Sequence, residues 1–269
     1  MFARIKHLFS EPSDEVQGAA IPAGERVYAI GDIHGRLDLF EKLIEAIEED
    51  DRVAAPAETT IILLGDLVDR GPESAGVIER ARTWQAQRNV RILAGNHEEM
   101  FLESFEQKDV LRHFLRHGGR ETVLSFGVDP DAFRTASLDE VQGMMDEAIS
   151  PDTRRFLAEL EDMIEIGDYL FVHAGINPAL SLEQQPRDTL RWIREPFLSH
   201  SEAFARVVVH GHTINENVQD RGNRIGIDTG AYASGRLTAL VLEDTQRRYL
   251  ETVQHADGSI IAQPRALGR

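Results

Sequence analysis

The stretch TTIILLGDLVDRGP, residues 59–72, joins a continuous apolar run to two aspartates and an arginine. A run without polar alternation predicts a strand that is buried on both faces of a sheet. Asp66, Asp69 and Arg70 then stand at the end of that strand, where the ordinary interpretation is a turn with a solvated ion pair. Whether they have a chemical role depends on what other strands bring to the same place.

Two similar runs lie on either side of this one, RVYAIGD (26–32) and NVRILAGN (89–96). Residues 36–50 carry apolar side chains at helical spacing, and residues 73–88 also predict a helix. Alternation of strand and helix predicts a parallel sheet with right-handed crossovers. Further strands are predicted at 163–175, 206–213, 223–230, 236–244 and 246–254.

The domain organisation expected from these patterns is one α/β domain over residues 26–254. The stretch 98–163 is mostly helical in pattern, so we expect a helical insertion that covers the site and selects substrate. The polar, Pro- and Gly-containing start predicts a flexible tail over residues 1–25. A second tail is expected over residues 255–269.

Composition excludes several kinds of chemistry. The 269 residues contain no cysteine, which rules out disulfides, thiolate metal ligands and a cysteine nucleophile. The formal net charge of −17 argues against nucleic-acid binding, which needs an excess of Lys and Arg. The sequence has neither an apolar run of membrane-spanning length nor a secretory pattern, so we expect a cytoplasmic protein without stable membrane association.

The decisive pattern is that side chains of metal-binding types follow several of the predicted strands. Asp32 and His34 lie in GDIHG, and Asn96 and His97 lie in GNHE. Further histidines follow later strands: His173 in FVHAG, and His210 and His212 in VVHGHT. Each pattern alone is weak, because GNHE could be a helix N-cap and His173 a core histidine. Together they predict one site, because the carboxyl ends of parallel strands open into one crevice. Mixed oxygen and nitrogen ligands favour Mn, Fe or Zn over Mg or Ca, and their number favours two ions that share a carboxylate.

The motifs GDIHG, GDLVDRGP, GNHE, HAG and HGHT, in this order, resemble those of the calcineurin-like metallophosphoesterases. The resemblance implies a layered α/β/β/α sandwich of mixed sheets with a dinuclear metal centre at the strand ends, manganese being favoured. The form VDRG, with IDTGAY near the end, is similar to bacterial and phage Ser/Thr protein phosphatases. By motif, the implied metal ligands are Asp32, His34, Asp66, Asn96, His173 and His212. His210 is interpreted either as a residue that supports a metal ligand or as a structural residue.

The same resemblance implies a mechanism in which a metal-bridging hydroxide attacks phosphorus in line. Arg70 would bind the phosphate, together with Asn96 and, from the WIR motif, Arg194. His97 would protonate the leaving group, and Asp69 would orient its imidazole. The expected substrate is a phosphorylated protein or a small phosphate ester.

The alternative is a dinucleoside-polyphosphate hydrolase of the symmetrical tetraphosphatase type. Those relatives tend to carry Ala at the position of Asp69. An anhydride also needs less leaving-group protonation, so Asp69 favours monoester hydrolysis.

Overall fold

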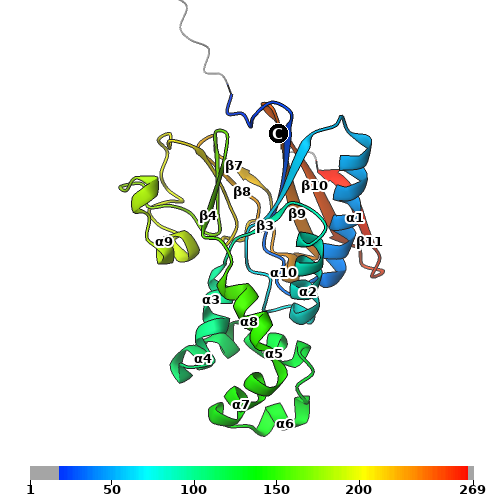
Figure 1. The fold of residues 1–269 in the computed structure, drawn as a ribbon, viewed down its shortest axis with the longest axis vertical. Helices are drawn as coiled ribbons and strands as arrows, with labels where there is room; N and C mark the ends of the chain where they lie inside the picture. The colour runs from blue at the N-terminus through cyan, green and yellow to red at the C-terminus, as the bar shows by residue number, and fades with distance from the viewer. Residues whose placement is uncertain (1–17, 266–269) are drawn as a thin grey trace, which may run out of the picture.

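The computed structural model describes residues 18–265. Within them the chain forms two mixed β-sheets with helices on their outer faces (Figure 1). The first sheet has the strand order β11-β10-β9-β1-β2-β3, and the second has the order β4-β5-β6-β8-β7. The expected α/β class with two mixed sheets is confirmed.

The elements have the following bounds. The first sheet contains β1 (Glu25–Ile30), β2 (Glu58–Leu63), β3 (Val90–Ile92), β9 (Arg236–Glu243), β10 (Gln246–Gln254) and β11 (Ile260–Arg265). The second contains β4 (Met163–Ile166), β5 (Tyr169–Val172), β6 (Val207–His210), β7 (Gln219–Asp220) and β8 (Arg224–Gly226). The helices beside the sheets are α1 (Leu37–Val53), α2 (Ser74–Gln85), α3 (Asn96–Glu103), η2 (Leu182–Gln184), α9 (Arg187–Trp192) and α10 (Ala231–Ser234). Between α3 and β4 lie α4 (Lys108–Phe114), the π-helical turn η1 (Leu115–Gly119), α5 (Arg120–Ser125), α6 (Pro130–Thr135), α7 (Leu138–Ala148) and α8 (Pro151–Ala158).

Alternation along the strands builds four layers. In β1, Tyr28 and Ile30 join the core that contains the buried face of α1. Val27 and Ala29 point to the opposite face and pack in a second core with apolar residues of β5, β6 and β8. The outer face of the second sheet forms a third core with Leu190 of α9. Because successive side chains of a strand point to opposite faces, one continuous apolar run fills two cores at once.

The register of the parallel strands sets the position of the site. Ile30 of β1 pairs with Leu63 of β2, and Leu63 pairs with Ile92 of β3. All three strands therefore end at the same level, and the loops that follow them leave the sheet at one edge. In the second sheet β5, β6 and β8 are also parallel.

The helical segment α4–α8 lies together at one end of the molecule, below both sheets in Figure 1. Its apolar side chains, Phe114 and Val123 among them, belong to the same core as α1 and α2. The sequence pattern predicts a helical insertion at 98–163, and this helical segment lies within that range. The segment therefore packs directly on the domain rather than on a core of its own.

Three expectations from the sequence need correction or completion. Residues 260–265, expected as part of a tail, form β11, which pairs antiparallel with β10. The stretch 163–175 is two antiparallel strands, β4 and β5, because Gly167 and Asp168 turn the chain between them. Of the expected N-terminal tail, residues 1–17 lie outside the described part, whereas Ile21 is buried and donates its N–H to the Asp244 carbonyl at 3.0 Å. Among residues 18–265 no helix is long and apolar enough to cross a membrane.

Candidate metal centre and active site

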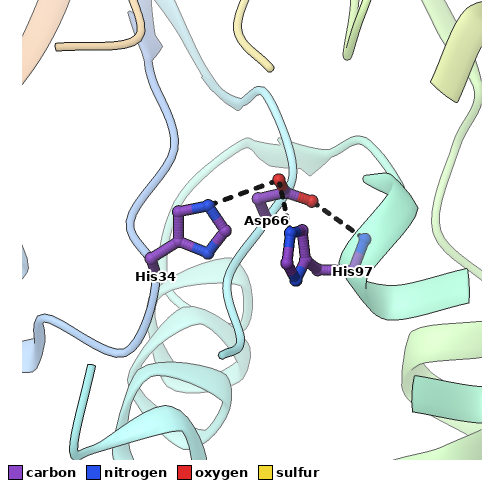
Figure 2. A group of neighbouring side chains, drawn as sticks. All are labelled: His34, Asp66 and His97. Carbon is purple, nitrogen blue, oxygen red and sulfur yellow. Dashed lines mark hydrogen bonds and ion pairs between the residues drawn. The ribbon is translucent and has the colours of Figure 1, made fainter. Parts of the chain in front are cut away.

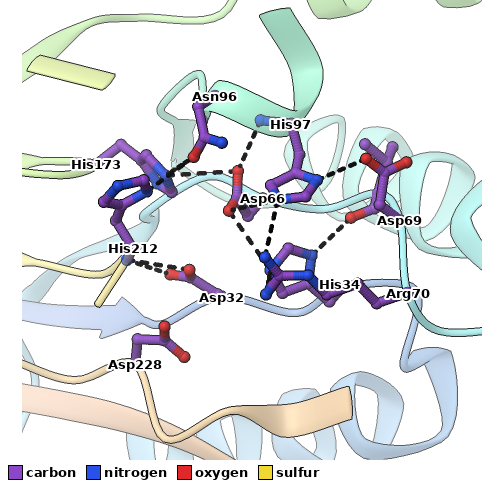
Figure 3. A network of polar contacts seen from close by, with 12 residues as sticks. Asp32, His34, Asp66, Asp69, Arg70, Asn96, His97, His173, His212 and Asp228 are labelled. Carbon is purple, nitrogen blue, oxygen red and sulfur yellow. Dashed lines mark hydrogen bonds and ion pairs between the residues drawn. The ribbon is translucent and has the colours of Figure 1, made fainter. Parts of the chain in front are cut away.

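The site is built from the loops that follow β1, β2, β3, β5 and β6 (Figure 3). Positive φ angles occur at five of its non-glycine residues, His34, Asp66, Asp69, Arg70 and His212. Such a conformation is uncommon for residues with a Cβ and costs roughly 1 kcal/mol or more at each position. Tight turns held at this cost direct the side chains of several loops to one point.

One group of convergent side chains contains Asp66, His173 and His212, whose potential ligand atoms all lie within 4.8 Å of one another. The Asn96 amide oxygen lies 3.0 Å from His173 Nε2 and 2.8 Å from His212 Nδ1. His173 Nδ1 donates to the Leu64 carbonyl at 2.8 Å, so its Nε2 carries a lone pair. That lone pair faces the Asn96 oxygen and, at 3.4 Å, an oxygen of Asp66.

Lone pairs that face one another without a proton between them are the arrangement that a cation satisfies. His212 Nε2 is also buried without a hydrogen-bond partner in the described part of the chain. The donor set, a carboxylate, an amide oxygen and imidazole nitrogens, suits a transition-metal ion or zinc. These residues therefore fit a divalent metal ion.

A second group contains His34, Asp66 and His97, again with ligand atoms within 4.8 Å (Figure 2). His34 Nδ1 donates to the Val68 carbonyl at 2.8 Å, which leaves its Nε2 lone pair 3.5 Å from an Asp66 oxygen. Asp66 belongs to both groups, so its carboxylate lies between them. This is the position expected for a ligand shared by two ions.

Asp32 belongs to neither group of convergent ligand atoms. Its carboxylate accepts the backbone N–H of His212 at 3.0 Å and lies next to Asp228 (Figure 3). A Cβ on Gly211 would lie 2.0 Å from an Asp32 oxygen, so only glycine lets the carboxylate approach. The structure thus brings five of the six sequence-predicted ligands into direct contact around Asp66 and Asn96, and places Asp32 at their border.

Burial governs the protonation of these groups. It raises the pKa of Asp32 well above its usual range and also raises that of Asp66, with the mutual charges of the aspartates adding to the effect at Asp32. It lowers the pKa of His173 to about 3 and that of His212 to about 2. The imidazoles are therefore neutral, as metal ligands must be, while the buried carboxylates need a positive charge beside them.

His97 and Asp69 form a buried pair next to the second group. His97 Nδ1 lies 2.6 Å from Asp69 Oδ2 and donates to it, which leaves Nε2 as a hydrogen-bond acceptor. Burial lowers the pKa of His97 and raises that of Asp69. This is the pairing that the sequence predicted for an oriented proton donor.

Two arginines border the site. The Arg70 guanidinium donates to His34 Nε2 at 2.9 Å and to His97 Nε2 at 3.0 Å, and it lies over the Tyr232 ring at 4.7 Å. Arg194 is exposed. Burial is the main cause of the lowered pKa values of His173 and His212, and the charge of Arg194 lowers them further, which places it near the first group.

Sequence reasoning did not assign roles to three buried polar residues of the site. Glu98 accepts backbone N–H groups from Gly95, Asp66, Leu67 and Val68 and so holds the loop after β2. Thr122 donates to Asp69, and Asp228 has a buried oxygen without a partner in the described part of the chain. Glu98 and Asp228 stand inside the motifs GNHE and IDTG, whereas no local pattern marks Thr122.

His210, expected to support a metal ligand or to be structural, is buried beside the site. Its Nε2 contacts Arg224 at 3.3 Å, and its ring packs edge-on against Phe197 with the centroids 5.0 Å apart. Neither group of convergent ligands includes it. These contacts support the structural interpretation.

Residues 25–229 match the family model described as calcineurin-like phosphoesterase. The chain belongs to this family. It is 28% identical over 280 residues to a symmetrical bis(5'-nucleosyl)-tetraphosphatase of Acidovorax ebreus (strain TPSY), covering 85% of this chain and 97% of the relative. It is also 28% identical over 240 residues to serine/threonine-protein phosphatase 2 of Escherichia coli K12, covering 84% and 97%.

Among solved structures, the chain is similar to the cold-active protein-tyrosine phosphatase of a psychrophilic Shewanella, with a TM-score of 0.52 and 20% identity. The alignment covers 97% of this chain and 88% of that one. At this identity the likeness concerns the fold alone. The family membership makes the chain a phosphoesterase, while its relatives carry names from two substrate classes.

Proposed function

We propose that this phosphoesterase hydrolyses phosphate monoesters, with phosphorylated Ser or Thr side chains of proteins as its substrates. The observation that carries the proposal is the Asp69–His97 hydrogen bond of 2.6 Å beside the convergent ligand groups. Hydrolysis of a monoester releases an alkoxide, which is a poor leaving group and needs a proton donor. A phosphoanhydride releases a better leaving group, so its hydrolysis depends less on a proton donor. The bond to Asp69 would hold His97 in a fixed orientation as that donor.

We further propose that two divalent ions, manganese before iron or zinc, bind here. One would be held by Asp32, His34 and Asp66. The other would be held by Asp66 together with Asn96, His173 and His212. The bound ions would supply the Lewis acidity that activates water and neutralises the charge of the phosphate.

The remaining steps fall to the chain itself. Arg70 would leave the imidazoles of His34 and His97 and bind phosphate oxygens with the N–H donors of its planar guanidinium group. Arg194 and the Asn96 side chain would bind the same phosphate. Once Arg70 has left it, His97 would take up a proton from solvent on Nε2, and the Asp69 carboxylate would stabilise this imidazolium form. The Nε2 proton would then go to the leaving oxygen, which returns the ring to its neutral Nδ1–H form.

A second candidate function is hydrolysis of dinucleoside tetraphosphates. The observation in its favour is the relative from Acidovorax ebreus, which aligns over 97% of its own length. This activity would use the same ligand groups and Arg70 but would depend less on His97.

The cytoplasmic location stays a prediction from the sequence.

The test is a paired turnover assay on protein reconstituted with Mn²⁺. One arm uses a phosphothreonine peptide and p-nitrophenyl phosphate, and the other uses diadenosine tetraphosphate. We expect turnover of the esters with little cleavage of the anhydride. A strong preference for the dinucleotide would make the second candidate correct.

The variant His97→Asn tests the proton donor directly. We expect it to keep its metal content and to lose most of its ester turnover. His255→Asn is the matched control, because His255 is exposed and lies in the turn before β11. Full ester activity in His97→Asn would overturn the assignment of the donor.

A further inference from the structure

We propose that Thr122, in α5 of the helical segment, is a positioning residue that fixes the proton donor through Asp69. The inference rests on the proposed function, because it assumes that His97 protonates the leaving group. It goes beyond that function by making an element outside the metal-ligand loops part of the catalytic geometry.

The two oxygens of the Asp69 carboxylate are divided between two partners. Oδ2 accepts the His97 Nδ1 proton at 2.6 Å, and Oδ1 accepts the Thr122 hydroxyl proton, also at 2.6 Å. Neither Asp69 nor Thr122 is exposed to solvent. Because water does not reach the carboxylate, Thr122 is its support on the side opposite the imidazole.

The orientation of the Thr122 hydroxyl is itself fixed by its neighbours. A hydroxyl has one proton and two lone pairs. The proton goes to Asp69 Oδ1, so the lone pairs accept the Asp69 backbone N–H at 2.8 Å and the Ser74 hydroxyl at 3.0 Å. Every hydrogen-bonding position of Thr122 is therefore used, and a rotation of its side chain would break several bonds at once.

Thr122 holds both the backbone and the side chain of Asp69. Asp69 has φ +73°, a strained conformation that persists only where its surroundings impose it. Its N–H is shared between Thr122 and Ser74 of α2. The same hydroxyl thus fixes the turn after β2 and the carboxylate that the turn carries.

The consequence is a direct link between the helical segment and the chemistry. Thr122 is 53 residues from Asp69 in sequence, and α5 packs on α2 within the same core. In addition, the Gly118 carbonyl of η1 accepts the Arg70 N–H at 3.1 Å. The docking of α5 and η1 therefore sets the positions of both the Asp69–His97 pair and the phosphate-binding arginine.

The test compares Thr122→Val, which keeps the shape but removes the hydroxyl, with Thr122→Ser, which keeps the hydroxyl. Ser125→Ala is the matched control, because Ser125 is a hydroxyl residue of the same helix that bonds to Thr122 O and Ala75 N rather than to Asp69. Each protein, loaded with Mn²⁺, is assayed on p-nitrophenyl phosphate and on phenyl phosphate. Phenol is the poorer leaving group and depends more on the proton donor.

We expect Thr122→Val to lower kcat for phenyl phosphate roughly tenfold more than kcat for p-nitrophenyl phosphate, with KM and metal content unchanged. Thr122→Ser should stay within about threefold of the parent on both esters, and Ser125→Ala should match the parent. Equal losses on both esters in Thr122→Val would overturn the proposal, because a structural role does not distinguish the leaving groups. Thermal unfolding of each variant identifies any loss that comes from unfolding.

Including His97→Asn separates this proposal from the one on which it rests. If His97→Asn shows no selective loss on phenyl phosphate, the proposed function of His97 fails. If His97→Asn shows the selective loss and Thr122→Val does not, only the role of Thr122 is refuted.

Discussion

Gly118 is predicted to control both the stability of the helical segment and the position of the phosphate-binding arginine. It has φ +104°, and a Cβ built on it would lie 2.4 Å from Arg70 N and 2.8 Å from Arg70 Cα and Cγ. Gly118→Ala would therefore strain its own backbone and push on Arg70. Gly127→Ala is the control, because Gly127 has φ +89° in the turn after α5 but has no atom within 4 Å of the Cβ position.

The two variants share one cost and differ in another. Placing alanine at positive φ costs about 1 to 2 kcal/mol at either position. The contact with the Arg70 backbone adds about 1 to 3 kcal/mol to Gly118→Ala alone, as overpacking does elsewhere. Gly118→Ala should therefore be the less stable variant in urea unfolding by about that second amount.

The effect on catalysis should separate the variants further. A hydrogen bond to a charged group contributes about 1.5 to 3 kcal/mol, and about 1.4 kcal/mol corresponds to a factor of ten in rate. Displacing the Arg70 guanidinium from the phosphate should thus lower kcat/KM for p-nitrophenyl phosphate roughly 10- to 100-fold in Gly118→Ala. Gly127→Ala should keep the parent value. Equal stability and equal kcat/KM in the two variants would refute the idea that η1 holds Arg70.

Four further results are expected. Chelation of bound metal should lower the melting temperature, and added Mn²⁺ should restore it. A cation at a concentration of a hundred times its Kd stabilises the folded state by about 2.7 kcal/mol, so an unchanged melting curve would contradict the metal centre. Arg194→Ala should raise KM for phosphate esters roughly tenfold with little change in melting temperature, and an unchanged KM would show that Arg194 does not hold the substrate. Although burial raises the pKa of Asp50, hydrogen bonds from Arg248 and Tyr28 outweigh it and lower the pKa below the ordinary 3.8. The stabilisation by Asp50 is then present above pH 3.8 and lost as the pH falls through the lower folded-state value, so urea midpoints of the parent and Asp50→Asn should differ at pH 7 and converge in acid. Phe40→Ala should cost about 3 to 5 kcal/mol in urea unfolding, because Phe40 is fully buried against Trp84; a cost below about 1 kcal/mol would mean that the core closes over the gap.

The sequence by itself determined the parallel part of the first sheet and the types of side chain at its edge. An unbroken apolar run such as 61–64 must be covered on both faces, and the polar residues that stop it must leave the sheet where the strand ends. Because these rules are local, they predicted Asp66, Asn96, His97 and His173 at strand ends. The pairing of His97 with Asp69 was implied by the family resemblance alone.

Only the tertiary structure decided how distant residues complete the site. The hydroxyl that supports Asp69 comes from Thr122, and the carboxylate that holds the loop after β2 comes from Glu98. It also placed Asp32 beside Asp228 and paired β11 with β10, although residues 260–265 show no strong alternation. Such contacts depend on which elements pack together in three dimensions, whereas periodicity and spacing report only on the next few residues along the chain.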